Sequence, residues 1–201
     1  NKYYVNQESN NCIACGHCYA ICPQNAMLPE NHDKVEPIIP FSATHKNFMN
    51  FIRSRRSHRE YIDKPIEREK IDQLIDIARY APTGTNAQPV QYLVVESEEM
   101  RKMVTKEMMK VYKTFNKLMN NRFIRFLASI FVDKRVKKPE LKRELNVFVN
   151  RYKNGEDPLF YNAPLIVICY VDTYEQNSGY DDCVYALYNM VFAAETLGLS
   201  S

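Results

Sequence analysis

Four cysteines near the start of the chain constrain its fold more than any other feature. Cys12, Cys15, Cys18 and Cys22 are separated by two, two and three residues, and a proline follows the last of them. This spacing is that of the bacterial cysteine run that ligates a [4Fe–4S] cluster, because the short intervals wrap three thiolates around one corner of the cluster. The run therefore predicts an iron–sulfur centre, with these four cysteines as its metal ligands.

The fourth cysteine leaves the number of clusters open. In proteins with two clusters, the last cysteine of such a run ligates the other cluster, and this chain has one run. Either one cluster takes all four thiolates, or a first run precedes Asn1. We favour the second alternative because the chain does not begin with Met. A structural zinc site is the weaker alternative, since zinc favours paired two-cysteine hooks in a tetrahedral arrangement.

Residues 1–40 form the first expected domain, a small ferredoxin-like [4Fe–4S] domain that is incomplete at its N-terminus. The segment is short and polar and has four prolines, so it needs a metal to hold its shape. Gly16 supplies a loop position where the backbone lies close to the cluster. His17 is a candidate for tuning the cluster's potential.

Residues 45–201 form the second expected domain, with helices and strands in one chain. Apolar spacing predicts a helix over 67–80, which Pro82 and Gly84 end, and another over 181–198 that Asp181 or Asp182 caps. That second helix has an apolar stripe of Val184, Leu187, Tyr188 and Val191. Residues 91–96 and 165–172 are predicted to form strands. Cys169 and Cys183 are predicted to be buried structural residues.

Composition narrows the classes of function. With 45% hydrophobic residues the chain can bury a core, and its net charge of +3 is too small to indicate a nucleic-acid partner. No apolar run reaches the length of a membrane span. Cysteines in a metal-type spacing favour a reducing compartment, so we expect a cytoplasmic protein.

The segment 101–153 is basic and is predicted to form two or three helices. The simpler interpretation is that its Lys and Arg side chains cover solvated outer faces. The alternative is a docking surface for an acidic electron-carrier protein, because complementary charge accelerates encounter.

Two further segments indicate a phosphate and a planar ligand. Arg55, Arg56, Ser57 and Arg59 gather guanidinium forks around a hydroxyl, which suits the phosphate of a mononucleotide. The segment APTGTNAQP, 81–89, follows the predicted helix and gathers polar groups in a turn. Its Asn and Gln carboxamides offer a donor and an acceptor together, which suits the edge of a flavin pyrimidine ring.

These segments carry a resemblance to a known family. RRSHREYIDKPI, APTGTNAQP, YNAPLIVICYVD and DDCVYALYNMVFAAETLGL occur here in the order seen in the nitroreductase family of FMN oxidoreductases. With the cysteine run, the chain resembles the ferredoxin-fused nitroreductases of anaerobic microbes. The resemblance implies an α+β fold with a mostly antiparallel sheet flanked by helices, and an intertwined homodimer with FMN at its interface.

The resemblance also implies roles for individual residues. Arg55 and Ser57 would hold the FMN phosphate, Arg56 would contribute through its backbone, and Arg59 would be a further phosphate or ribityl partner. Four residues of the other protomer would reach the flavin: Pro82, Thr83, Gly84 and Asn86. Gln88 would support the loop that carries them. The family's chain continues past the point where this one ends, to a loop beside the flavin N5 and a last basic residue, so we expect the second domain to be incomplete at Ser201.

The expected function follows from the two cofactors together. Electrons would pass from the iron–sulfur cluster or clusters through FMN to a small acceptor such as a nitroaromatic or a quinone. The donor would be a ferredoxin-type protein or NAD(P)H. No catalytic side chain is expected, because the flavin supplies the chemistry. The alternatives are a non-enzymatic electron carrier or redox sensor, and a different enzyme on the same scaffold, such as a reductive dehalogenase or a flavin-degrading enzyme. Neither a nucleic acid nor a membrane is an expected partner.

Overall fold

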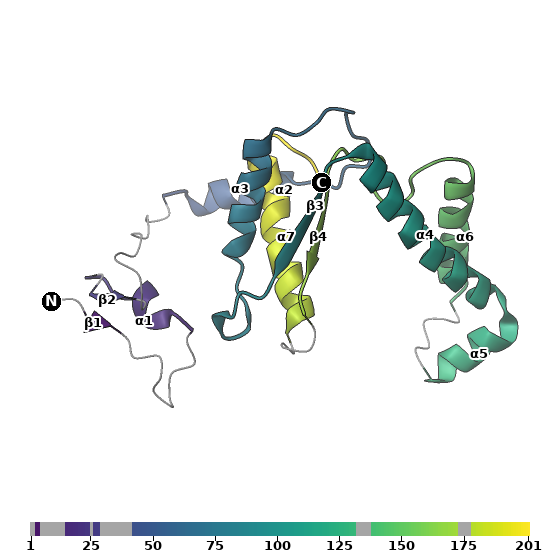
Figure 1. Ribbon diagram of the computed structural model, residues 1–201, viewed down its shortest axis with the longest axis horizontal. Helices are drawn as coiled ribbons and strands as arrows, with labels where there is room; N and C mark the ends of the chain where they lie inside the picture. The colour runs from purple at the N-terminus through teal and green to yellow at the C-terminus, as the bar shows by residue number, and fades with distance from the viewer. Residues whose placement is uncertain (1–2, 5–14, 25, 29–41, 132–137, 173–177) are drawn as a thin grey trace. The chain divides into compact units, whose positions relative to one another are not determined.

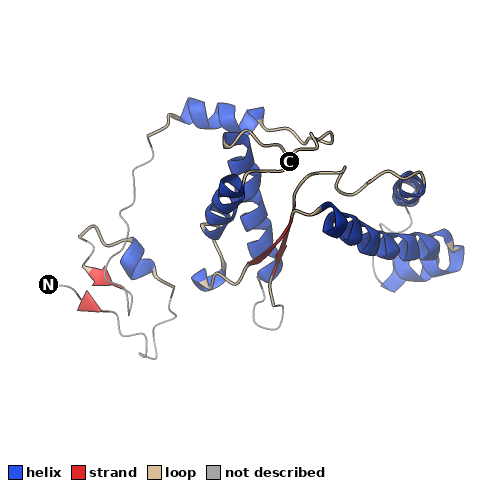
Figure 2. Cartoon of the chain, turned by 45° about the horizontal axis from the view of Figure 1, so that its top comes forward, coloured by secondary structure: helices blue, strands red, loops and turns tan. Residues whose placement is uncertain are grey.

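A computed structural model of the chain describes residues 3–4, 15–24, 26–28, 42–131, 138–172 and 178–201 (Figure 1). The chain divides into two compact units. The first comprises residues 1–57, 68–92 and 169–201, and the second comprises 58–67 and 93–168. Figure 2 shows that helices make up most of the described structure and that the strands are short. Cys12 lies outside the described residues.

The first unit contains the cysteine run and most of the predicted site. Its helices and strands are β1 (Tyr3–Tyr4), α1 (His17–Ala20), β2 (Met27–Leu28), α2 (His45–Ser54), α3 (Arg68–Arg79), the 3-10 helix η1 (Gly84–Asn86) and α7 (Gly179–Thr196). β1 and β2 pair in parallel, with Tyr3 opposite Met27. The helix predicted over 67–80 is confirmed as α3, and the one predicted over 181–198 is confirmed as α7, which begins two residues earlier.

The core of the first unit lies between α3 and α7, which run side by side in Figures 1 and 2. α3 buries Ile71, Leu74 and Ala78, which share one face. α7 buries Ala186 and Met190 on the matching face, together with two further alanines, so small side chains allow the helices to approach closely. α2 joins this core through Phe51, whose ring centroid lies 5.6 Å from that of Phe192 on α7.

The apolar stripe predicted on α7 does not form this core. Val184, Leu187 and Tyr188 are exposed, and Tyr188 has an exposed fraction of 56%. The buried face is instead made of small residues and includes Asp182, which has an exposed fraction of 2%. The prediction that Asp181 or Asp182 caps the helix was wrong, because Ser178 occupies the N-cap position. α7 therefore has two largely apolar faces, and the described part of the chain buries one of them.

The second unit is built from α4 (Glu98–Asn120), α5 (Arg122–Phe131) and α6 (Pro139–Lys153). These are the helices expected in the basic segment. α4 packs against both α5 and α6. Met119 and Leu145 form a core cluster there, and the rings of Tyr112 and Phe148 stack with centroids 6.0 Å apart. Exposed Lys side chains on α4 pair with Glu98 and Glu107 on the same helix, which is compatible with both interpretations of the basic segment.

Two strands link the units along the chain. β3 (Gln91–Val95) and β4 (Ile166–Tyr170) confirm the predicted strands and hydrogen-bond to each other in a two-stranded sheet. Val95 and Ile166 are buried, whereas both strands also carry half-buried and exposed positions. None of the described helices combines the length and the hydropathy that crossing a bilayer requires.

Candidate functional site

Arg55 and Ser57 lie together where α2 ends. Arg55 is the C-cap residue of α2, and its Nη1 donates to the hydroxyl of Ser57 over 3.5 Å. Arg55 is half-buried and Ser57 is exposed. The contact brings a fixed positive charge and a neutral hydroxyl together, a combination that suits a phosphate oxygen.

Arg56 turns away from that point. Its Nη1 donates to the carbonyl oxygens of Arg53 and Arg55, the latter over 2.8 Å. These carbonyls belong to the end of α2, where a helix leaves acceptors unpaired and favours positive charge. The side chain of Arg56 thus caps the C-terminal end of α2, while its backbone lies between Arg55 and Ser57 in sequence.

Arg59 belongs to the second unit and has different partners. Its guanidinium carbon lies 5.3 Å from the ring centroid of Tyr161, and that of Arg151 lies 5.5 Å from the same ring. Tyr161 and Asn162 both have a φ of 55°, a backbone conformation that costs about 1 kcal/mol or more outside glycine. The carboxylate of Asp157 holds this turn by accepting three backbone N–H groups, including that of Asn162.

The loop around η1 is tightly bonded to itself. The Thr83 hydroxyl accepts the Gln88 N–H over 3.0 Å, and the Thr83 carbonyl accepts the Asn86 N–H over 3.0 Å. Thr85, Asn86 and Gln88 all have positive φ, which Asn tolerates better than Thr or Gln. Pro82, Asn86 and Gln88 are exposed, whereas Thr83 and Gly84 are half-buried. The predicted flavin loop is therefore a strained turn with polar groups on its surface.

Asp182 anchors this strained loop, a role that the sequence analysis missed. Its Oδ1 accepts the Gly84 N–H over 3.2 Å, and its Oδ2 accepts the Ser178 hydroxyl over 3.2 Å. The first bond joins η1 to α7 across 98 residues of sequence. The available signal was a pair of acidic residues, Asp181 and Asp182, at the start of a largely apolar helix, which sequence reasoning assigned to capping.

Replacing Asp182 with alanine is expected to lower the free energy of unfolding by about 2 kcal/mol, because it leaves the Gly84 N–H without its acceptor. Asp181→Ala is the matched control: it removes the same charge from the same helical turn, but its side chain is exposed. Urea unfolding of both variants measures the difference. Equal destabilisation would show that helix-dipole charge, and not the loop anchor, is what Asp182 contributes.

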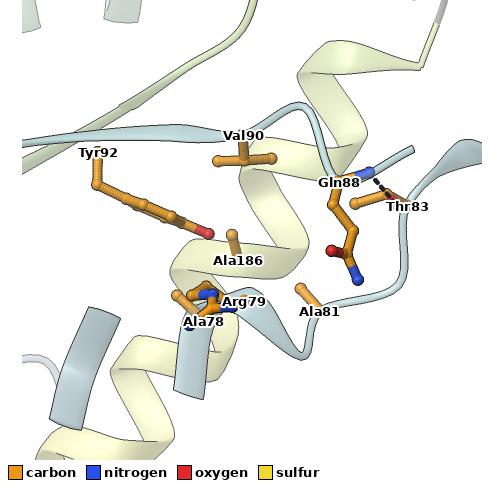
Figure 3. A pocket seen from close by; sticks show the side chains of 8 residues that line it. All are labelled: Ala78, Arg79, Ala81, Thr83, Gln88, Val90, Tyr92 and Ala186. Atoms are coloured by element: carbon orange, nitrogen blue, oxygen red, sulfur yellow. Dashed lines mark hydrogen bonds between the residues drawn. The ribbon is translucent and has the colours of Figure 1, made fainter. Parts of the chain in front are cut away.

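A cavity of about 160 Å³ lies in the first unit, between η1, α3 and α7 (Figure 3). Thr83 and Gln88 are the predicted site residues that line it, and Arg79 and Tyr92 add polar groups. The remaining lining is apolar: Ala78, Ala81, Val90 and Ala186. A cavity of this size takes a small molecule, whereas drug-sized ligands occupy about 300 Å³ or more. It can therefore form only part of a site for a ligand as large as a flavin nucleotide.

The described cysteines of the run, Cys15, Cys18 and Cys22, are half-buried around α1. Gly16 precedes α1 with a φ of 74°, which fits the role predicted for it as the loop glycine. The Cys22 sulfur accepts the Ala26 N–H over 3.3 Å. Such bonds stabilise thiolate sulfur, so the donor set suits an iron–sulfur centre. Among residues that the structure describes, no three His, Cys, Asp or Glu side chains form a metal-sized cluster by themselves.

Cys169 on β4 and Cys183 on α7 are half-buried, not fully buried as predicted. Burial, with a smaller contribution from Cys183, raises the pKa of the Cys169 thiol from 9.0 to about 11. Burial and then Asp182 raise the pKa of Cys183. Burial, followed by both cysteines, also raises the pKa of Tyr92. With their pKa values raised, these three groups are neutral near pH 7.

Alkylation of Cys169 by iodoacetamide is expected to be about a hundredfold slower in the folded chain than in the denatured chain at about pH 8, because only the thiolate reacts. The rate should rise with pH until about pH 11 in the folded chain and level off near 9 in the denatured chain. Mass spectrometry after pulsed labelling measures both profiles. Superimposable profiles would contradict the raised pKa.

Comparison with characterised proteins gives short matches in sequence. The chain is 32% identical over 56 residues to nitrobenzene nitroreductase of Ectopseudomonas oleovorans, which covers 28% of this chain and 25% of that protein. It is 36% identical over 50 residues to the FMN reductase [NAD(P)H] of Bacillus subtilis, which covers 25% of this chain and 20% of that protein. The matched segments thus span a quarter or less of these relatives' own length.

Solved structures match over a larger part of the fold. An FMN-dependent nitroreductase from Clostridium difficile aligns with a TM-score of 0.53 and 22% identity, covering 78% of this chain and 59% of that one. An oxidised iodotyrosine deiodinase, solved with FMN and 3-iodo-L-tyrosine bound, aligns with a TM-score of 0.54 and 20% identity, covering 76% of this chain and 71% of that one. At these identities the likeness concerns the fold, and it confirms the predicted α+β class.

Two family models match the chain. The model of the 4Fe-4S binding domain matches residues 7–28, which contain all four cysteines of the run. The model of the nitroreductase family matches residues 52–201, which contain the Arg55–Ser57 pair, the η1 loop and α7. This second match covers most of the chain, and the chain therefore belongs to the nitroreductase family.

Proposed function

We propose that this chain is an FMN-dependent oxidoreductase that passes electrons from an iron–sulfur centre through FMN to a small acceptor such as a nitroaromatic or a quinone. One observation carries the proposal: a nitroreductase-family domain and a 4Fe-4S binding segment occur in the same chain. We divide the chain into a cluster domain, 1–40, and a flavin domain, 45–201. The names of the relatives, which include an FMN reductase and nitroreductases, support FMN and the acceptor class.

Arg55 and Ser57 would hold the FMN phosphate. Their side chains already point to one place, so a phosphate would replace the long contact between them with two charge-assisted hydrogen bonds. The backbone of Arg56 would contribute a further N–H, because its side chain is used at the end of α2. Arg59 would add positive charge near the phosphate or ribityl chain, and Tyr161 would orient it.

A second copy of the chain would complete the flavin site. The cavity in the first unit is too small for a flavin, and the η1 residues Pro82, Thr83, Gly84 and Asn86 would reach the ring held by the partner protomer, with Gln88 supporting the loop. Tyr180, Val184, Leu187 and Tyr188 are all exposed on α7, which supports this arrangement, because clustered exposed apolar side chains favour burial against another surface. We therefore expect a homodimer in solution.

Cys12, Cys15, Cys18 and Cys22 would ligate the cluster. Gly16 gives the loop its left-handed turn, and the Ala26 N–H would help to hold the Cys22 thiolate. Bound FMN supplies one- and two-electron chemistry at its ring, so it can connect a one-electron centre with a two-electron acceptor. The residues of this chain would position that ring and exclude water, and Gln88, Arg79 and Tyr92 would supply the polar groups of the cavity. No side chain is assigned to proton transfer.

Anaerobic turnover tests the proposal. The chain, loaded with FMN, iron and sulfide, is reduced with dithionite and mixed with nitrobenzene or menadione, and product formation is followed over many cycles. We expect turnover well above that of free FMN at the same concentration. Reduction and reoxidation without product would instead favour the electron carrier or redox sensor. Turnover no faster than that of free FMN would contradict an enzymatic site.

A further inference from the structure

The loop that carries the predicted cluster ligands is tied to the η1 loop by one side chain. The Asn86 Nδ2 donates to the backbone carbonyl of Cys15 over 2.8 Å, across 71 residues of sequence. Asn86 Nδ2 is also the closest atom, at 3.3 Å, to the position that a side chain on Gly16 would occupy. The contact therefore involves the backbone of a cluster ligand and the glycine next to it.

The orientation of the Asn86 carboxamide follows from its partners. The Cys15 carbonyl can only accept, so the amide nitrogen of Asn86 must face it. On its other side, the Asn86 Oδ1 lies 3.4 Å from the Gln88 Nε2, which can donate. Asn86 is also well suited to its backbone conformation, since its φ of 57° is one that Asn adopts more readily than most residues. The two hydrogen-bond partners thus assign the amide nitrogen of Asn86 to the side of Cys15.

The η1 loop is a firm base for this contact. Gly84, two residues before Asn86, is bonded to the buried carboxylate of Asp182 on α7. A chain of hydrogen bonds therefore runs from the backbone of Cys15 through η1 to the core helix of the first unit. The same loop contributes Thr83 and Gln88 to the cavity.

We infer that Asn86 is a positioning residue that docks the cluster loop on the η1 loop, so that the cluster held by Cys15 delivers electrons directly to the flavin site. The inference rests on the proposed function. Each transfer moves one electron: the reduced cluster is oxidised, the flavin is reduced, and an external low-potential donor restores the cluster. Two such transfers, with protons from water, complete the two-electron reduction of the flavin. Because electron tunnelling weakens steeply with distance, losing the docking contact slows this step even when both cofactors stay bound.

Asn86→Asp tests the inference because it keeps the size of the side chain and its tolerance of positive φ, but replaces the donor with a carboxylate that repels the Cys15 carbonyl. Thr85→Asp is the matched control. It adds the same charge at the preceding position, where the side chain bonds, within the described residues, to the Gly84 carbonyl of its own loop. Both variants are prepared as the full chain with FMN and cluster, and iron and FMN content are measured first.

Two readouts are compared. Stopped-flow absorption measures the transfer of electrons from the dithionite-reduced cluster to FMN, and amide hydrogen exchange measures the protection of residues 17–22. In Asn86→Asp we expect transfer in the FMN-loaded fraction of the sample to slow about tenfold, as the loss of one hydrogen bond predicts, with faster exchange over 17–22 and unchanged iron content. Thr85→Asp should match the wild type in both.

Two results would overturn the inference: unchanged exchange over 17–22 in Asn86→Asp, or equal slowing of transfer in both variants. Failure of the proposed function can be distinguished from failure of this inference, because in that case the wild-type protein would bind no FMN. In that case the exchange readout alone still decides whether Asn86 docks the cluster loop.

Discussion

Replacing Arg55 and Ser57 together with alanine is expected to weaken FMN binding more than a hundredfold. Each residue would make a charge-assisted hydrogen bond to the phosphate, and such bonds contribute about 1.5–3 kcal/mol each. The structure supports a joint effect, because Arg55 and Ser57 point to the same place at the end of α2. Titration of the flavin-free protein with FMN, followed by quenching of flavin fluorescence, measures the dissociation constant.

The chain offers a closely matched control for this change. Arg53 and Ser54 precede the pair in sequence, are both exposed, and lose the same charge and the same hydroxyl when replaced by alanine. The backbone carbonyl of Arg53 that accepts Arg56 remains in this control. We expect Arg53→Ala with Ser54→Ala to change FMN affinity less than threefold or so, as long-range charge alone would. Equal losses in the two double variants would place the phosphate elsewhere.

Replacing Cys15 and Cys18 with serine is expected to remove about four irons per chain while FMN binding is retained. A serine hydroxyl is a poor ligand for iron, and the double substitution removes two of the thiolate ligands that the cluster needs. FMN is retained because the proposed phosphate pair lies on α2, outside the cysteine run. Iron and acid-labile sulfide assays, with flavin absorption on the same sample, measure both contents.

Cys169→Ser with Cys183→Ser controls for general effects of removing thiols. These cysteines lie on β4 and α7, outside the run, so iron content should stay at the wild-type level. A separate Cys22→Ser variant distinguishes the two arrangements of the run. If the wild type holds one cluster and Cys22→Ser loses it, the result would favour a single site with four cysteine ligands. If Cys22→Ser instead damages a second cluster, the result would favour two cluster sites. Full iron content in Cys15→Ser with Cys18→Ser would contradict the assignment of the run.

The parts of the fold that were predicted correctly are those with strong local signals. α3 has regular apolar spacing followed by Pro82 and Gly84, and its predicted bounds differ from the observed ones by one residue at each end. The two faces of α7 could not be told apart from the sequence, because both are apolar. The large residues Val184, Leu187 and Tyr188 predict a core face by size, yet the alanines of the other face pack against α3. The close packing of α3 against α7 leaves room for small side chains at the contact.

The candidate site was predictable where its residues are neighbours in sequence. Arg55 and Ser57 are two residues apart, and the η1 residues form one turn, so motif and local chemistry sufficed. Asp182 and the Asn86–Cys15 contact were not predictable in this way, because each joins segments that are 71 or more residues apart. Such contacts depend on how the elements pack, and neither a period nor a spacing in the sequence encodes them.

We propose that one chain holds both an iron–sulfur centre and FMN. The most direct test is to purify the protein without oxygen and to measure iron, sulfide and flavin per chain. We predict about one FMN, together with about four irons for one cluster or about eight for two, with sulfide equal to iron. Iron with no flavin, even after FMN is added in excess, would contradict the account and leave an electron carrier whose second domain has no assigned cofactor.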